Sequence, residues 1–433
     1  MAKRLPPGPG LFTMARGMFD LSFTFVDIAK KYGDPFSVPL PFGTTVVTYS
    51  PEGNKAIFSA DPDTFASTGA DILKGLLDLS VLATFGAQHK RQRKLLMPPF
   101  HGARMRAYGL LMRERALDQA ERIERGKPFV MVDLTQSITL DVIIEAVFGV
   151  NSRERMQEFR QAILAMLDSF TPLALMPQLR RSLFGLSPFS RLLRHMTRLQ
   201  SLVDDLCREY RAAPAGRQDI LSLLLAAKDE DGSGLSDREI FDQLITIIVA
   251  GHETTAVMLA WAFYCLHRNP DQLAQLQAEL AAHPADADPE VIARLPFLSA
   301  VIDETLRLYP PVHIIHRRLQ KPLTLGGYEL EPGHVVAAGA FVTHRLESLY
   351  PDPERFLPQR FIDRSYGPFE FLPYGGGARR CLGAAFASYE MKQVLFALLK
   401  QHRYECLENG PVGFVHRPGT VGPKGGIRML RPA

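Results

Sequence analysis

The feature that most constrains this chain is a long stretch without a helix breaker, between Ser236 and Pro270. Ser236 and Glu239 match the S-x-x-E capping box, in which the two side chains satisfy backbone amides at the start of a helix. The residues that follow are largely apolar. The pattern predicts a helix of ~30 residues, ~45 Å long at 1.5 Å per residue, which can cross a whole domain.

The centre of this predicted helix is polar, with the sequence AGHETT over residues 250–255. A glycine inside a helix costs ~1 kcal/mol, and a carboxylate among apolar side chains needs a partner. The segment is therefore either a hydrogen-bonded kink in a core helix or a functional site. His252 and Glu253 begin like the HExxH zinc motif, but Ala256 stands where the second histidine belongs, which excludes that class.

Length and composition indicate a soluble globular protein. A chain of 433 residues can bury a large core without disulfides or structural metals. Its 46% hydrophobic and 22% charged residues are ordinary for a soluble fold, and a net charge of +4 argues against a nucleic-acid arm or acidic tail. His252 and Glu253 divide the most apolar region, Leu244 to Leu266, into runs too short to span a bilayer. No signal peptide is recognisable, so we expect a cytoplasmic protein without a membrane anchor.

The remaining sequence predicts a mainly α fold with small β-sheets near both ends. Amphipathic stretches predict helices at 102–123, 133–148, 154–170, 189–212 and 219–228. β-Branched residues bounded by turn signals predict a strand pair within 36–49 and further strands within 323–341. We expect a single domain over residues 1–433, with a β-richer part at about 1–60, a helical body at about 65–310, and strands with a cysteine-bearing loop at about 311–433.

Cys381 stands apart from the other cysteines, Cys207, Cys265 and Cys406, which are too scattered for a disulfide framework and fit a reducing compartment. It ends the segment YGGGARRC, whose glycines permit a loop that can lie flat against a large group. A helix-forming run follows, and a helix N-terminus favours the thiolate. The alternatives are a buried structural cysteine and a phosphate loop, for which the third glycine and the Walker lysine are missing.

The segment Tyr374 to Gly383 resembles the haem-binding loop of the cytochrome P-450 haem-thiolate monooxygenases, Phe-x-x-Gly-x-Arg-x-Cys-x-Gly. Gly377, Arg379, Cys381 and Gly383 match that pattern, and Tyr374 replaces the usual phenylalanine. The tyrosine hydroxyl needs a hydrogen-bond partner that the phenylalanine would not.

Three further motifs are similar to those of the family and occur in its order. AGHETT resembles the oxygen-binding groove of the long central helix. Glu304 and Arg307 resemble the Glu-x-x-Arg helix, and Arg355 in the segment PERF is expected to complete a Glu–Arg–Arg network. Each short motif alone is weak, since Glu and Arg at this spacing usually form a solvated ion pair. Together with the cysteine loop, they make the resemblance specific over most of the chain.

The resemblance implies a cytochrome P-450 fold in which haem b lies between the central helix and the loop that carries Cys381, the expected axial ligand of the iron. His89 and Arg93, four residues apart on one predicted helix, resemble a site for the haem propionates, as do Arg317 and Arg379. Arg318 is a rival to Arg317. The expected haem-binding residues are His89, Arg93, Ala250, Gly251, Arg317, Tyr374, Gly375, Arg379 and Gly383.

The resemblance also implies the reaction. O2 is activated with two external electrons, and a hydrophobic molecule such as a terpenoid, steroid or fatty acid is hydroxylated or epoxidised. Glu253 and Thr254 are the expected acid–alcohol pair for proton delivery. The predicted pocket draws on regions 72–82 and 164–189 and on the segment before Arg317; His313 there could instead be an ordinary hydrogen-bonded histidine. Its named residues are Leu73, Leu76, Leu77, Ile247, Ala250, Val312 and His313.

Two other functions use the same loop: a peroxide-driven peroxygenase, which usually lacks the acid–alcohol pair, and a non-enzymatic haem-thiolate sensor. For a monooxygenase, four scattered cysteines cannot hold a ferredoxin cluster, so we expect reducing equivalents from NAD(P)H through a ferredoxin or flavodoxin and its reductase. We expect a monomer without nucleic-acid partners. Lys90, Arg91, Lys94 and Arg380 are the predicted docking patch for the donor; the alternative is that they solvate an exposed helix.

Overall fold

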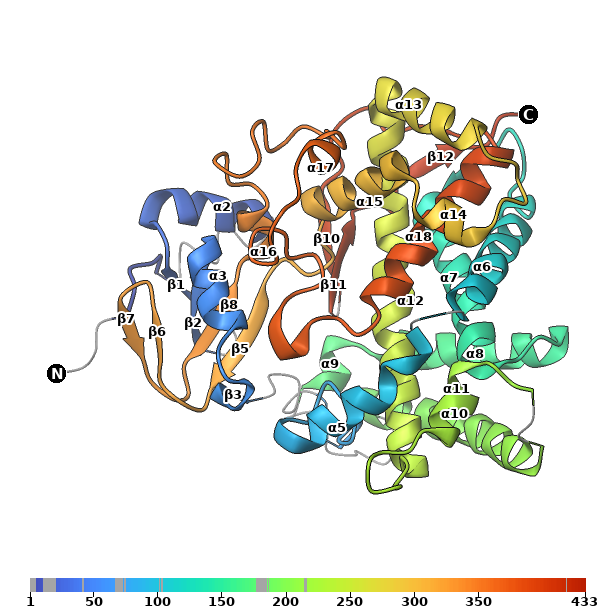
Figure 1. Cartoon of the computed structure of the whole chain (residues 1–433), viewed down its shortest axis with the longest axis horizontal. Coiled ribbons are helices and arrows are strands. Elements are labelled where there is room, and N and C mark those ends of the chain that lie inside the picture. Colours follow the sequence, from blue (N-terminus) through green and yellow to red (C-terminus); the bar gives the residue numbers. More distant parts are fainter. Residues whose placement is uncertain are drawn as a thin grey trace.

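The computed structural model describes residues 5–10, 21–40, 43–66, 73, 75–100, 102, 104–176, 185, 187–213, 216–417 and 419–433. The predicted pocket regions 72–82 and 164–189 therefore lie partly outside the described residues. A large helical part and a smaller β-rich part lie beside one another (Figure 1).

The predicted long helix is α12 (Asp237–Arg268), and its 32 residues begin with the complete capping box of Ser236 and Glu239. In Figure 1 it runs through the middle of the helical part. It packs against α7 (Met131–Phe148) and α18 (Ala384–Gln401). Among the described residues it is the one helix long and apolar enough to cross a membrane, but 67% of its most apolar window is buried inside the fold. It is thus the core helix of the domain.

The other predicted helices are present within a few residues of their expected bounds. They are α6 (Arg104–Glu121), α7, α8 (Arg153–Ser169), α10 (Pro188–Ala212) and α11 (Ile220–Ala226). Side-chain caps from Ser187 and Asp219 explain where α10 and α11 begin. The further helices are α2 (Leu21–Tyr32), α3 (Pro51–Phe58), α5 (Gly86–Leu96), α9 (Pro172–Leu175), α13 (Pro270–Ala281), α14 (Pro289–Ala293), α15 (Pro296–Leu308), α16 (Ala340–Thr343) and α17 (Arg360–Asp363).

The strands predicted near the two ends of the chain join in one sheet. Its order is β1 (Phe36–Leu40), β2 (Gly43–Thr48), β8 (Val335–Ala338), β5 (Ile315–Leu319) and β3 (Phe65–Ala66). β2 and β8 are parallel, with Val46 opposite Val336, and the other pairs are antiparallel. The pairing of β2 with β8 brings segments almost 300 residues apart into contact, and β5 pairs with the other edge of β8.

Three smaller sheets complete the described fold. β6 (Leu323–Leu325) pairs with β7 (Tyr328–Leu330), and β12 (Arg428–Leu430) lies between β4 (Pro128–Val130) and β9 (Glu405–Cys406). The hairpin of β10 (Phe414–Arg417) and β11 (Thr420–Pro423) contacts α12. A methyl group on Gly422 would approach Val257 Cγ1 to 3.0 Å, so this hairpin lies directly against the central helix.

Candidate active site

The glycines before Cys381 allow a tight loop to pack on α3. Gly375 and Gly377 have φ of +66° and +65°, a backbone region that other residues rarely adopt. A Cβ on Gly377 would lie 2.4 Å from the carbonyl oxygen of Phe58, and one on Gly376 would lie 2.6 Å from the Phe58 ring. The Cys381 amide donates to the Tyr374 carbonyl at 2.9 Å and closes the loop. Since α18 begins at Ala384, Cys381 lies just before a helix N-terminus, as predicted.

Cys381 is the solvent-exposed member of the four cysteines. The surrounding chain nevertheless crowds its sulfur, and this burial raises the pKa of the thiol above its usual value. The Gly383 amide, Arg93 and Arg380 lower that pKa, but they do not offset the desolvation. In the chain without a bound metal ion or cofactor, the helix terminus is therefore not enough to make Cys381 a thiolate, contrary to the expectation. A stronger positive charge, such as a metal ion, is needed to hold the thiolate.

A cluster of cationic side chains lies close to the cysteine loop. His89 and Arg93 come from α5, Arg317 from β5 and Arg379 from the loop itself. Burial and the charges of Arg379, Arg93 and Arg317 lower the pKa of His89 to about 4. Burial and Arg379 lower the pKa of Arg317 to about 10. Among the described residues, no carboxylate contributes to the pKa values of these four groups. The cluster thus suits an anionic ligand.

The structure distinguishes Arg317 from its rival. Successive residues of a strand point to opposite faces, and Arg317, not Arg318, shares its environment with Arg379 and His89. Arg379 in turn donates hydrogen bonds to the carbonyl oxygens of Val81 and Thr84, at 3.4 and 2.5 Å. The predicted grouping of His89, Arg93, Arg317 and Arg379 is therefore present in space.

One face of the middle of α12 is accessible, although most of the helix is buried. Ile247, Ala250, Gly251 and Thr254 recur at helical spacing on this face, and Ala250 is the most exposed of them. The Thr254 hydroxyl donates to the Ala250 carbonyl at 2.7 Å. Such a face on a core helix, lined mainly by small and apolar groups, can contact a hydrophobic ligand.

The other polar residues of the AGHETT segment point elsewhere. His252 is buried against α7, where its Nδ1 lies 3.0 Å from the Thr139 hydroxyl, and burial lowers its pKa to about 4. It is therefore a neutral packing residue. Glu253 forms an ion pair with Arg417 of β10, with 2.7 Å between Oε1 and Nη1. His252 thus has the satisfied hydrogen bond expected of a core helix, while a functional role for the segment stays a prediction.

The predicted Glu–Arg–Arg network exists, but with a different second arginine. Glu304 and Arg307 on α15 are fully buried and joined by two hydrogen bonds of 2.7 and 2.8 Å. Arg360 of α17 binds the same carboxylate at 3.1 Å. The prediction of Arg355 is wrong, because its side chain is 68% exposed and pairs with Asp352, while its carbonyl alone accepts from Arg307. The neighbouring residues do not distinguish the two arginines, because each is followed by a phenylalanine, at 355–356 and at 360–361.

Comparisons with known proteins agree with this geometry. The model of the cytochrome P450 family matches residues 6–430. The chain belongs to the cytochrome P450 family. Its relatives include "Putative cytochrome P450 138" of Mycobacterium tuberculosis, 33% identical over 99% of this chain and 96% of that protein. "Putative cytochrome P450 135B1" of the same species is 35% identical over 92% of this chain and 85% of that protein.

The fold agrees with solved cytochrome P450 structures. "Retinoic acid bound cyanobacterial CYP120A1" superposes with a TM-score of 0.85 at 25% identity, with 99% of both chains covered. The "cytochrome P450DA heme domain" superposes with the same score at 24% identity, covering 99% of this chain and 97% of the other. The predicted family and fold class are therefore confirmed, and the chain is a haem-thiolate monooxygenase of the general cytochrome P450 type.

The residues of this cytochrome P450 fit the haem of its family. An accessible thiol can serve as the iron ligand, and the cation cluster without carboxylates suits the two haem propionates. The glycine loop is held close to α3, and its left-handed glycines carry no side chain that would project from it. The Tyr374 hydroxyl is buried beside the loop, and this burial raises its pKa, which a side-chain hydrogen bond with Ser388 of α18 partly opposes.

Several predicted pocket residues are placed differently. Leu76 and Leu77 are 0% and 2% exposed and belong to the main hydrophobic core, with Leu73 packed against it. Val312 is exposed, as a lining residue should be. His313 is buried, and its Nδ1 lies 2.6 Å from the Ser22 hydroxyl of α2. Leu76 and Leu77 thus lie in the core, and His313 forms the hydrogen bond that its alternative interpretation expected. Their place in a substrate pocket stays a prediction.

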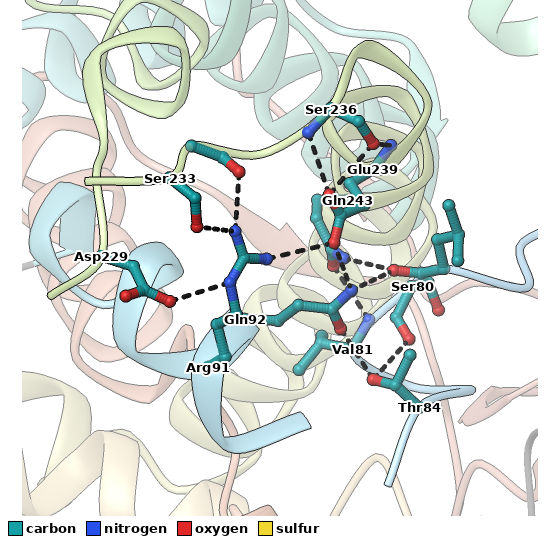
Figure 2. Close-up of polar contacts among 12 residues, drawn as sticks. Ser80, Val81, Thr84, Arg91, Gln92, Asp229, Ser233, Ser236, Glu239 and Gln243 are labelled. Atoms are coloured by element: carbon teal, nitrogen blue, oxygen red, sulfur yellow. Dashed lines mark hydrogen bonds and ion pairs between the residues drawn. The ribbon is translucent and has the colours of Figure 1, made fainter. Parts of the chain in front are cut away.

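Arg91, one of the predicted docking cations, lies in a polar network (Figure 2). Its guanidinium pairs with Asp229 at 2.8 Å and Glu239 at 3.4 Å, and it donates to Ser233 Oγ and the Gly234 carbonyl. The neighbouring Gln92 donates to Glu239 and to the Leu79 carbonyl. The network ties α5 to the first turn of α12. It corrects the assignment of Arg91 to an open surface patch.

This network also supports the cation cluster. Gln243 of α12 donates to the Leu79 carbonyl and accepts from the Val81 amide. The carbonyl of the same Val81 accepts a hydrogen bond from Arg379. Figure 2 shows Gln92 and Gln243 meeting at this segment. Sequence reasoning missed Gln92, Gln243, Arg360 and Arg417, because their partners lie far away along the chain.

Proposed function

We propose that this cytochrome P450 hydroxylates or epoxidises a hydrophobic small molecule of the terpenoid, steroid or fatty-acid class. The observation that carries the proposal is the accessible face of α12, where Ile247, Ala250 and Gly251 offer apolar surface and Thr254 the one hydroxyl. The structural relative whose title names bound retinoic acid supports a hydrophobic substrate. We further propose that the protein is a cytoplasmic monomer that uses haem b, without nucleic-acid partners.

Each group of site residues has a role in this proposal. Cys381 would ligate the iron, while Arg93, Arg317 and Arg379 would neutralise the propionates and His89 would offer one of them a hydrogen bond. The backbone at Ala250 and Gly251 would face the porphyrin, with Tyr374, Gly375 and Gly383 on the cysteine side. Haem with a cysteine thiolate ligand supplies the electron density that favours cleavage of the O–O bond.

Proton delivery falls to the acid–alcohol pair. Thr254 lies on the accessible face of α12, and its hydroxyl can exchange the Ala250 carbonyl for a water molecule or a ligand. Glu253, the residue before it, is in contact with solvent because its side chain remains 25% exposed. Positioned proton transfer of this kind is worth ~10²–10⁴-fold in rate.

The loss of Cys381 tests the ligand assignment. Cys381→Ala is expected to abolish the thiolate-type carbon monoxide difference spectrum of the reduced protein, because the three other cysteines are distant along the chain and two are buried. Cys406→Ala, at a partly buried position, is the matched control and should retain the spectrum. A spectrum that survives Cys381→Ala, or is lost with Cys406→Ala, would contradict the assignment.

Substrate and proton relay are tested together. Spectral titration with a library of terpenoids, steroids and fatty acids should give substrate-type difference spectra, and polar metabolites should not. With a compound that binds, Thr254→Ala should keep its affinity but divert reducing equivalents to peroxide. Equal product per NAD(P)H in both proteins would refute the role of Thr254. Turnover that needs only peroxide would favour the peroxygenase alternative.

We propose that electrons come from NAD(P)H through a ferredoxin or flavodoxin and its reductase. The docking patch is smaller than the sequence suggested, because Arg91 is half-buried in its network and Lys94 pairs with Glu230. Lys90 and Arg380 are exposed, and neither forms an ion pair within the described part of the chain. Arg380 adjoins Cys381, so this pair of cations would steer an acidic donor toward the iron ligand.

A further inference from the structure

Two buried glutamines, Gln92 of α5 and Gln243 of α12, hold one short segment of backbone. Both are 0% exposed, and their Nε2 atoms donate to the same acceptor, the Leu79 carbonyl, at 2.7 Å each. Residues 79–84 form turns and not a helix or strand, so side chains from other elements satisfy much of their backbone. Figure 2 shows both side chains reaching this segment from two different helices.

Each glutamine also binds one further residue of the segment. Gln243 Oε1 accepts from the Val81 amide at 2.9 Å, and Gln92 Oε1 accepts from the Thr84 hydroxyl at 2.7 Å. Each side-chain amide therefore uses its donor and its acceptor on the same segment. A buried amide that lost such a partner would pay the desolvation cost of an unpaired polar group, so this arrangement is strongly favoured over others.

Val81 and Thr84, the two residues that the glutamines hold, are also the two whose carbonyls bind Arg379. Nη1 of Arg379 donates to the Val81 carbonyl at 3.4 Å, and Nη2 donates to the Thr84 carbonyl at 2.5 Å. These acceptors are neutral, so they fix the guanidinium without cancelling its charge, as a carboxylate would. An arginine carries five N–H donors in a rigid plane, and those that the carbonyls leave free can bind an anion.

We propose that Gln92 and Gln243 are positioning residues that orient Arg379 toward a haem propionate. The contacts run from α5 and α12 through Val81 and Thr84 to the cysteine loop. Each carbonyl can direct the guanidinium only while its own residue is held in place, and the glutamines hold these two residues. Pairing with a carboxylate depends on the direction of the guanidinium plane. Loss of either glutamine therefore weakens haem retention, although both act through Arg379.

This inference rests on the proposed haem site, and one measurement tests both. The haem-loaded protein is mixed with an excess of an acceptor globin, and the rate of haem transfer is followed by absorbance. Gln243→Leu and Gln92→Leu remove the amide and keep a side chain of similar size, and each should raise this rate about fivefold. Arg379→Gln should raise it about tenfold. In the Arg379→Gln background, either glutamine change should alter the rate less than about twofold, because its effect passes through Arg379.

Thr84 offers a milder change at one of the same contacts. Thr84→Val removes the hydroxyl that binds Gln92 but keeps the shape of the side chain, and it should raise the rate of haem transfer about threefold. Thr84→Ser keeps the hydroxyl and should restore the wild-type rate. A loss of packing would give the opposite order, because serine lacks a methyl group that valine retains.

Gln119→Leu is the matched control. Gln119 is another buried glutamine, 6% exposed, but it binds Asp141 of α7 outside this network. Urea unfolding of the haem-free variants measures the general loss of stability. Gln119→Leu and Gln243→Leu should both lose stability, but Gln119→Leu should leave the rate of haem transfer unchanged.

The outcomes separate the two proposals. A wild-type rate of haem transfer in both glutamine variants, or an effect that is equally large without Arg379, would overturn the positioning role alone. The same holds if Thr84→Ser is as fast as Thr84→Val, or if Gln119→Leu accelerates transfer as much as Gln243→Leu. A wild-type rate in Arg379→Gln would overturn the proposed propionate site, and the positioning role with it.

Discussion

Two clusters of arginines in this cytochrome P450 differ in whether their charge is balanced. Around Glu304, the cations of Arg307 and Arg360 share one carboxylate, and the remaining guanidinium hydrogens of Arg307 bind the carbonyls of His344, Pro353 and Arg355. Around His89, three arginines lie near one another without a carboxylate among the described residues. Both clusters are largely buried, yet one is satisfied within the chain and the other is not.

This difference indicates that the cluster around Glu304 is part of the scaffold and that the cluster around His89 is a binding site. A buried charge that the chain itself satisfies stabilises one packing arrangement, and its removal leaves a partner uncompensated. Burial first, and the neighbouring arginines second, lower the pKa values of His89 and Arg317, so holding positive charge here costs free energy in the isolated protein. Such a cost is recovered when an anionic ligand binds. In this family that ligand is haem.

The strongest test breaks the balanced cluster. Arg307→Ala should lower the free energy of unfolding by ~3–5 kcal/mol, because it removes two of the four hydrogen bonds to the fully buried Glu304 carboxylate. Urea unfolding, or the yield of folded protein where the loss is too large, measures the effect. Arg355→Ala is the control, and it should stay within ~0.5 kcal/mol since its side chain is on the surface. Equal losses in the two variants would contradict the corrected network.

A second test removes one positive charge from the cluster around His89. Arg317→Gln should weaken haem retention about tenfold, or ~1.4 kcal/mol, since one charge-assisted hydrogen bond to a propionate is lost. The haem-free protein should not lose stability, because the repulsion between Arg317 and Arg379 disappears. Haem transfer to an acceptor globin and unfolding of the haem-free protein give the two quantities. Arg318→Gln, on the other face of β5, should change neither; a matching loss of haem there would refute the assignment.

The smallest expected effect concerns surface cations, some of which are paired within the chain while others are not. Lys90→Glu together with Arg380→Glu should raise the apparent Michaelis constant for a ferredoxin about threefold at low salt, and less as ionic strength rises. Arg198→Glu with Arg208→Glu makes the same change of net charge on α10 and serves as the control. Arg91→Gln should lower the thermal midpoint instead, because its network is lost. Donor kinetics indifferent to Lys90 and Arg380 would place docking elsewhere.

Features encoded by neighbouring residues were predicted well. The capping box, the apolar run and the next breaker set the bounds of α12, and the glycines with the following helix placed Cys381 before α18. Arg360 shows the limit of such reasoning. Two Arg-Phe pairs lie five residues apart, and only the course of the chain through α17 decides which arginine reaches Glu304.

The sequence by itself determined the central helix and the cysteine loop, because helix caps, periodicity and loop glycines act over a few positions. The residues expected around the loop came from the family resemblance. Tertiary structure alone decided which charges meet. Arg91 binds Asp229 and Arg417 binds Glu253 across 138 and 164 residues of chain. An ion pair depends on the distance between two side chains in space, and sequence separation carries no information about that distance until the intervening helices and strands are packed.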